Sequence, residues 1–151
     1  KNSSNEFNFI TMDHVIEHLH DPVKALKKCF MLLKDEGQIW IQTPNIGSNG
    51  FYRFGKDWRG LEPPRHLVMF NKSSIKKALA EAGFKNIQFL NSLDPSTRTF
   101  SASYAISSNI SPYSNFKTPL RIYLDSFLNK WKTKIFAHQS EFITVIAKKK
   151  I

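Results

Sequence analysis

The sequence predicts an α/β fold, and three consecutive segments near its start carry that prediction. Residues 7–12 are rich in β-branched and aromatic types, which suits a strand. Asp21 and Pro22 then begin a helix over 22–33, because aspartate caps free N–H groups and proline fits the first helical position. Residues 39–43 read as a second strand. Two strands joined by a helix of this length predict a right-handed crossover with parallel neighbours.

The helix over 22–33 has an apolar face and a basic face. Its apolar positions recur at helical spacing, and they are Val23, Leu26, Phe30 and Leu33. Cys29 falls within this pattern, so we expect it in the core, and as the single cysteine it forms no internal disulfide. Gly37 follows the helix, where we expect it to supply the left-handed residue that ends it.

A long loop and a second strand–helix pattern come next. We expect a loop over 45–64, whose aromatic residues and arginines among glycines suit a mobile lid facing a substrate. A helix over 72–82 follows, capped by Asn71 and closed by Gly83. Residues 84–91 then alternate as a strand.

The remaining segments are less regular. Residues 92–119 are rich in serine, asparagine and proline, so we expect mostly loop with a short ordered piece at 104–106. A helix over 120–136 precedes a β-rich run at 141–147, and the three lysines at 148–150 read as a solvated tail. We expect a single domain over 1–151, with 92–139 as an insertion before the last strand.

The helix over 120–136 is amphipathic and basic. Six large apolar residues share one face: Leu120, Leu124, Phe127, Leu128, Trp131 and Ile135. Such a helix with flanking lysines is compatible with lying on an anionic bilayer. An apolar stripe is more often packed against its own domain, and we favour that interpretation.

Composition sets broad limits on function. The 151 residues are 41% hydrophobic and 23% charged, as in an ordinary globular domain, and no apolar run is long enough to cross a membrane. The net charge of +10 is compatible with an anionic contact, but the lysines are scattered over several predicted elements, so we favour a solvated lysine surface. The basic and aromatic residues do not form a recognised RNA-binding pattern, so we expect no nucleic-acid partner. One cysteine favours a cytoplasmic protein.

Several short motifs, in order, resemble class I S-adenosylmethionine-dependent methyltransferases, and their ubiquinone-biosynthesis-like branch most of all. These motifs are Asp13-x-x-x-Glu17-His18-x-x-Asp21-Pro22, Leu32-Leu33-Lys34-x-x-Gly37, Thr43-Pro44-Asn45, Arg65-His66-Leu67 and Ala80-Glu81-Ala82-Gly83-Phe84. The likeness covers residues 7–91. It implies a partial Rossmann-like methyltransferase sheet, made of the fourth to seventh strands with an antiparallel last strand, and S-adenosylmethionine as cofactor.

One expected part of such an enzyme does not occur in the sequence. The family begins with a strand and a glycine-rich turn that approaches the cofactor, but the six glycines here contain no G-x-G pattern. The resemblance therefore implies the carboxyl-terminal part of a longer domain. Residues 7–12 would then form a bare edge strand, and we expect this edge to pair with another chain, to be covered, or to form a homodimer.

Candidate cofactor residues follow the first strand. Met12, Asp13 and His14 lie at its carboxyl end, where ligands bind in open α/β sheets. By resemblance, Met12 and Asp13 would lie near the methionine portion of the cofactor. A capping or turn role for Asp13 is an equal alternative.

Candidate catalytic and acceptor residues come from two loops. His18 and His66 are the candidates for proton transfer, because imidazole titrates near neutral pH. Trp58, Arg59 and Arg65 are the candidates for acceptor binding, since arginines hold anions by paired hydrogen bonds. For His18 we favour the interpretation that it only braces its turn. For Arg65 and His66, a role that only ties the loop to the next helix is an equal alternative. We expect no metal site, because His14 and His18 have no matched third ligand.

These observations predict methyl transfer from S-adenosylmethionine to a small-molecule, lipid-linked or saccharide acceptor. The chain would supply the acceptor side and be inactive alone. The alternative is a non-catalytic module that binds anionic membrane surfaces or partners, with the helix over 120–136 in peripheral membrane contact.

Overall fold

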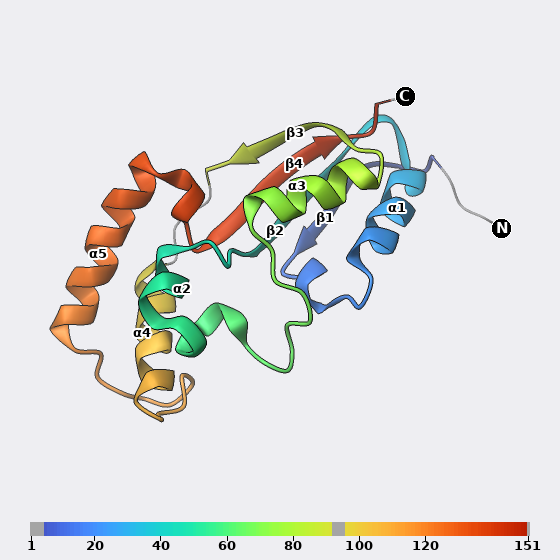
Figure 1. Cartoon of the computed structure of the whole chain (residues 1–151). Coiled ribbons are helices and arrows are strands. Elements are labelled where there is room, and N and C mark those ends of the chain that lie inside the picture. The colour runs from blue at the N-terminus through green and yellow to red at the C-terminus, as the bar shows by residue number, and fades with distance from the viewer. Residues whose placement is uncertain (1–4, 92–95, 151) are drawn as a thin grey trace.

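The computed structural model describes residues 5–91 and 96–150, and it is built on a four-stranded sheet (Figure 1). The strands are β1 (Phe7–Asp13), β2 (Leu33–Pro44), β3 (Lys85–Leu90) and β4 (Phe142–Lys148), in the order β1-β2-β4-β3. β1 and β2 are parallel, and α1 (Pro22–Leu32) joins them. β4 is antiparallel to both neighbours. The predicted crossover and antiparallel last strand are therefore confirmed.

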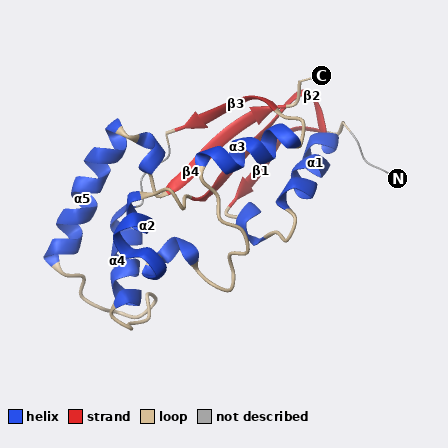
Figure 2. Cartoon of the chain, in the orientation of Figure 1, coloured by secondary structure: helices blue, strands red, loops and turns tan. Residues whose placement is uncertain are grey.

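Two helices cover one face of this sheet. α1 and α3 (Lys72–Glu81) lie side by side across it (Figure 2). Ile39 and Ile41 of β2 are fully buried in the core beneath them, whereas Trp40 between them is only half-buried because strand side chains alternate. The core therefore lies between the sheet and these two helices.

A helical lobe lies beyond the carboxyl ends of β1 and β2 (Figure 1). It contains α2 (Asn49–Phe54), α4 (Ser96–Ser107) and α5 (Leu120–Ile135). Short 3-10 turns complete the chain: η1 (Ile16–His18), η2 (Gly55–Asp57), η3 (Arg59–Leu61) and η4 (Ala137–Gln139). The lobe places structure directly over the sheet edge where α/β folds bind ligands.

Two loop predictions are wrong. The segment 45–64 contains α2, η2 and η3 in place of an irregular loop. Within 92–119, the predicted short ordered piece is the three-turn helix α4, which packs on α5, α2 and η3. Tertiary packing of this kind stabilises helices that local propensity does not predict. Residues 92–95, which begin the predicted insertion, lie outside the described residues.

Glycine and capping predictions have mixed outcomes. Gly37 lies within β2, and the left-handed residue is Glu36, with φ 61°. Glycine is needed at 37 because a Cβ there would lie 2.7 Å from the Lys34 carbonyl oxygen. Asn71 does cap α3 through the Ser74 amide, and Gly83 adopts φ 101° beyond its end.

The prediction that the lysines at 148–150 form a solvated tail is wrong for one of them. Lys149 is only 5% exposed, and its ammonium group donates to the Leu33 carbonyl at 2.8 Å and to Asn5 Oδ1 at 2.8 Å. The same group lies 5.1 Å from the centre of the Phe30 ring. Cys29 is buried in the core as expected, and burial raises the pKa of its thiol.

The orientation of α5 contradicts the favoured prediction. The six apolar residues of its predicted face are 55–76% exposed, while Ile122, Ser126, Asn129 and Thr133 are buried. The helix therefore packs through its polar side, because polar groups on α2 and α4 meet it there. No helix in the described part of the chain is long and apolar enough to cross a membrane.

β1 is an edge strand, as expected. It pairs only with β2 in the sheet, and Phe7 and Phe9 are 47% and 50% exposed. A long apolar edge of this kind offers free backbone groups for strand pairing.

Candidate active site

A cavity of about 300 Å³ lies where the helical lobe meets the ends of β1 and β2. Five of the residues singled out in the sequence line it: His14, His18, Arg59, Arg65 and His66. The structure thus brings together candidates from two segments that are more than 40 residues apart. The other lining residues are Pro44, Gly60, Glu62, Thr99 and Phe142.

His14 begins the cavity wall directly after β1. Its backbone adopts φ 51°, a left-handed conformation that is uncommon outside glycine and asparagine. Its Nδ1 lies 3.0 Å from Oε1 of Glu17, a fully buried carboxylate whose Oε2 accepts from the Thr43 hydroxyl at 3.0 Å. The bond to Glu17 raises the pKa of His14, with burial opposing it. Burial would raise the pKa of Glu17, but the hydrogen bonds from His14, its own backbone and Thr43 outweigh burial and lower it.

His18 and His66 lie side by side, with ring centroids 4.8 Å apart. Nδ1 of His18 is 2.8 Å from the Arg65 carbonyl oxygen, and Nδ1 of His66 is 2.7 Å from the Gly60 carbonyl oxygen. A carbonyl only accepts, so each Nδ1 carries the hydrogen. In the neutral ring this leaves Nε2 of both imidazoles as a proton acceptor. Bracing by Nδ1 and proton transfer at Nε2 are therefore compatible.

The carboxylate of Glu62 forms ion pairs with both arginines of the cavity. The Arg59 guanidinium binds both of its oxygens, at 2.7 and 3.1 Å, and the Arg65 guanidinium binds Oε1 at 2.7 Å. Tyr113 also donates to Oε1, at 3.2 Å. Burial opposes ionisation, but the hydrogen bond from Arg59, the charges of Arg59 and Arg65, and the hydrogen bond from Tyr113 lower the pKa of Glu62 to about 2. The arginine pair that the sequence suggested for an anionic acceptor is thus already shared with an internal carboxylate, and the trio keeps one net positive charge.

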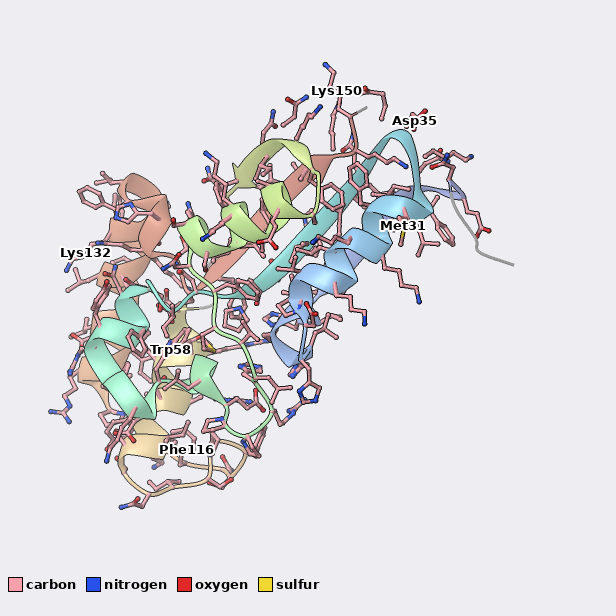
Figure 3. The ribbon with its side chains drawn as sticks, turned by 45° about the vertical axis from the view of Figure 1, so that its right-hand side comes forward. Met31, Asp35, Trp58, Phe116, Lys132 and Lys150 are labelled. Atoms are coloured by element: carbon pink, nitrogen blue, oxygen red, sulfur yellow. The ribbon has the colours of Figure 1, made fainter. Side chains whose placement is uncertain are left out.

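Trp58 does not line the cavity and lies inside the helical lobe (Figure 3). Its indole is 1% exposed and donates Nε1–H to Oε2 of Glu141 at 2.8 Å. Oε1 of Glu141 accepts from the Gly50 amide at 2.9 Å. Gly60 packs against the ring so closely that a Cβ there would lie 2.2 Å from an indole carbon. Trp58 therefore anchors the segment that presents Arg59 to the cavity.

The side chains of the three candidate cofactor residues, Met12, Asp13 and His14, lie in different surroundings. The Met12 side chain is part of the hydrophobic core. The Asp13 carboxylate is exposed, and the Gln42 amide donates to it at 3.4 Å. Of the three, His14 alone lines the cavity. A carboxylate and an imidazole at a strand end suit the charged groups of an amino-acid ligand.

Three side chains in the described part of the chain come close enough to suggest a metal site: Glu17, His18 and His66, with one ligand atom of each within 4.8 Å of the others. Both Glu17 oxygens already accept hydrogen bonds, from His14 and Thr43. A cation at these three side chains would therefore have to share the Glu17 carboxylate with His14 and Thr43.

Sequence reasoning missed Glu62, Thr99, Phe142 and Glu141. A signal for Glu62 was present, because it stands three residues after Arg59 and three before Arg65, a spacing that favours local ion pairs. Thr99, Phe142 and Glu141 reach the site only through the tertiary fold, so no local pattern indicates them.

Comparison of the sequence with protein-family models identifies a family. A family model described as a methyltransferase domain matches residues 1–89, more than half of the chain. No curated protein matches the sequence.

Solved structures share the fold at low sequence identity. A SAM-dependent methyltransferase from Thermotoga maritima, described as a possible histamine N-methyltransferase, is 18% identical over 98% of this chain and 58% of its own, with a TM-score of 0.57. A SAM-dependent methyltransferase from Archaeoglobus fulgidus is 19% identical over 96% of this chain and 60% of its own, with a TM-score of 0.56.

A third structure contains bound ligands. Haemonchus contortus phosphoethanolamine N-methyltransferase 2, in complex with phosphomonomethylethanolamine and S-adenosylhomocysteine, is 18% identical over 99% of this chain and 35% of its own, with a TM-score of 0.54. This chain thus spans 35–60% of the length of these three structures. Because the family model matches more than half of its residues, this chain belongs to the methyltransferase domain family.

Proposed function

We propose that this chain supplies the acceptor side of a methyltransferase that uses S-adenosylmethionine. The observation that carries the proposal is the pair of imidazoles in the strand-end cavity, His18 and His66, each with Nδ1 held by a backbone carbonyl. Methyl transfer is an in-line displacement, so a protein contributes positioning and, for an N–H or O–H acceptor, a base. The imidazole pair supports both roles.

The cofactor supplies an electrophilic methyl group on a sulfonium. The residues at the end of β1 fit its methionine portion, because the exposed Asp13 carboxylate can accept from an ammonium group and His14 lies between it and the cavity. The sequence offers no G-x-G turn for the adenosine portion. We therefore propose that residues outside this chain complete the cofactor site, and that the chain alone is inactive.

The roles of the cavity residues follow from their contacts. Nε2 of His66 or His18 takes the proton that the acceptor loses, and the backbone bond at Nδ1 holds each ring in place. The trio of Arg59, Glu62 and Arg65 orients the acceptor, and its net positive charge favours an acceptor with a nearby anionic group. Small metabolites, saccharides and lipid-linked molecules all meet this description.

The edge of β1 supports a further part of the proposal. Its free backbone groups and its exposed Phe7 and Phe9 suit pairing with an additional strand. We propose that this strand comes from the glycine-rich part of a longer methyltransferase domain, which makes this chain a carboxyl-terminal part. A second copy of the chain is the alternative, and small-angle scattering distinguishes a homodimer from a monomer.

Cofactor binding is the first test. By calorimetry, a polypeptide that also carries a glycine-rich first strand should bind S-adenosylmethionine at micromolar concentrations, and this chain alone should bind it weakly. Failure of the longer polypeptide to bind would remove the enzyme proposal.

The imidazole pair has its own test in that longer polypeptide. His66→Gln and His18→Gln should lower the rate of labelled methyl transfer roughly 10²–10⁴-fold for whichever residue is the base. Binding of S-adenosylhomocysteine should not change. His20→Gln is the matched control, because His20 is exposed and does not line the cavity. Unchanged rates in both cavity variants would show that neither histidine acts as a base.

A further inference from the structure

The outer surface of α5 is apolar where a helix of a globular domain is usually polar. We call this surface the α5 apolar face, and its members are Leu120, Leu124, Phe127, Leu128, Trp131 and Ile135. Each is 55–76% exposed. Scattered exposed apolar residues need no explanation, but a contiguous stripe along four turns indicates an interaction surface.

The inner surface of α5 shows why the helix is turned this way. Asn129 donates to the Ser96 hydroxyl at 2.7 Å and accepts from the Asn49 amide at 2.7 Å. The Ser126 hydroxyl, which donates to the Tyr123 carbonyl oxygen at 2.8 Å, lies 3.4 Å from the Thr97 hydroxyl. These contacts tie α5 to α2 and α4 through polar groups, so the outward direction of the apolar face is fixed by specific hydrogen bonds.

Basic residues flank the α5 apolar face on both sides. At 3.6 residues per turn, Arg121 and Lys132 fall along one side of it, and Lys130 and Lys134 fall along the other. The ammonium group of Lys134 lies 5.2 Å from the centre of the Trp131 ring. Asp125 is the one acidic residue of the helix, and Arg53 pairs with it at 3.2 Å. The free charge around the face is therefore positive.

We propose that the α5 apolar face docks on the surface of an anionic lipid bilayer. A 16-residue helix is about 24 Å long and carries four basic residues, so it would lie in the interface rather than cross it. The apolar side chains enter the acyl boundary, and the flanking lysines and arginine reach the lipid phosphates. This inference stands apart from the proposed methyl transfer.

Charge and position favour a bilayer over the other occupants. A second copy of the chain would bring the basic flanks of two helices together, which costs free energy, whereas anionic lipid complements them. A strand added at the β1 edge would not cover α5, because α5 lies at the far left of Figure 1, and α2 and α4 lie between it and β1.

Vesicle sedimentation tests the proposal. The protein should bind vesicles of equal parts phosphatidylglycerol and phosphatidylcholine, bind pure phosphatidylcholine vesicles weakly, and be released by salt. Phe127→Ala with Trp131→Ala should lower the partition coefficient at least roughly tenfold. Lys130→Gln with Lys134→Gln should lower it on anionic vesicles by about fivefold for each lysine. Circular dichroism verifies that the variants, all at surface-facing positions, remain folded.

Matched controls distinguish binding through the α5 apolar face from non-specific binding to vesicles. Phe7→Ala with Phe9→Ala likewise removes two half-exposed aromatic side chains, at the β1 edge, and Lys24→Gln with Lys28→Gln removes the same charge from α1. The aromatic control should leave binding unchanged, and the charge control should change it less than the α5 pair does. Equal losses in control and test variants, or no binding of the parent protein, would overturn the proposal. A dimer in sedimentation velocity that Phe127→Ala with Trp131→Ala dissociates would assign the face to a second copy instead.

Discussion

α1 and α5 are both amphipathic, basic helices, yet they face their surroundings in opposite ways. α1 buries Leu26 and Cys29 against the sheet and exposes its lysines. α5 buries Ser126, Asn129 and Thr133 and exposes its leucines and aromatics. The difference shows that an amphipathic pattern establishes that a helix has two faces, but the partner element decides which face is turned inward.

The largest test of this contrast compares the same substitution in both helices. Leu26→Ala removes a fully buried side chain and should lower the free energy of unfolding by about 2–5 kcal/mol. Leu128→Ala, on the α5 apolar face, should change it by no more than about 0.5 kcal/mol. Urea denaturation of both variants measures the two values. Similar losses would mean that α5 packs through its apolar face in solution.

The second test makes the inner face of α5 resemble that of α1. Asn129→Leu adds an apolar side chain but leaves the Asn49 amide without its acceptor, so stability should fall by about 1–3 kcal/mol. Arg121→Leu on the exposed side serves as control and should stay within about 0.5 kcal/mol. A stabilised Asn129→Leu variant would show that the polar contacts do not hold the helix.

A smaller effect is expected at the helix starts. Asp21 caps α1 by accepting from the Lys24 amide at 2.8 Å, whereas Pro119 at the start of α5 makes no side-chain cap. Asp21→Ala should therefore lower the free energy of unfolding by about 1 kcal/mol, and Pro119→Asp should raise it by a few tenths to about 1 kcal/mol. Thermal unfolding measures both. A neutral Asp21→Ala would mean that packing alone sets the start of α1.

The smallest effect depends on pH and lies on the α1 side of the fold. His14→Asn keeps a residue that tolerates the left-handed backbone but removes the charge beside Glu17. The raised pKa of His14 contributes stability that is complete below pH 6.5 and is lost as pH rises through the folded value. The lowered pKa of Glu17 contributes stability that is present above pH 4.5 and is lost as pH falls.

The difference between wild type and His14→Asn should therefore be greatest between pH 4.5 and 6.5. We expect roughly 0.5–1 kcal/mol there, because His14 is partly exposed and solvent screens the pair. Denaturation of both proteins at a series of pH values measures this difference. If the difference in stability between wild type and His14→Asn does not vary with pH, the His14–Glu17 ion pair does not stabilise the fold.

The crossover at the start of the chain was predictable because its periodicity, its Asp21-Pro22 cap and its β-branched runs agree with one another. α4 was not, because its serines and threonines are poor helix formers locally, and the buried Ser96 and Ser103 are explained only by packing. For the orientation of α5, the sequence does carry a local signal. Ile122, Ser126, Asn129 and Thr133 are uncharged and recur every three or four residues, as inward positions do.

The candidate site was predictable where chemistry is local. His14 lies directly after β1 and lines the cavity, because ligands bind at strand ends in an α/β sheet. Arg59, Arg65 and His66 come from the segment after α2, which the sequence also singled out as facing a substrate. Trp58 looked like an acceptor contact because aromatic residues in loops often bind ligands. Its partner Glu141 lies 83 residues away, and no local pattern could indicate that bond.

The Glu141 carboxylate has a consequence for how the molecule is completed. It immediately precedes β4, the last strand, and it holds both the start of α2 through Gly50 and the turn before Arg59 through Trp58. A polypeptide that stops short of residue 141 would contain every histidine and arginine of the cavity. It would lack the carboxylate that fixes the positions of Gly50 and Trp58, and with them the segment that carries Arg59. Formation of the cavity therefore depends on residue 141, although Glu141 is not one of the candidate acids or bases.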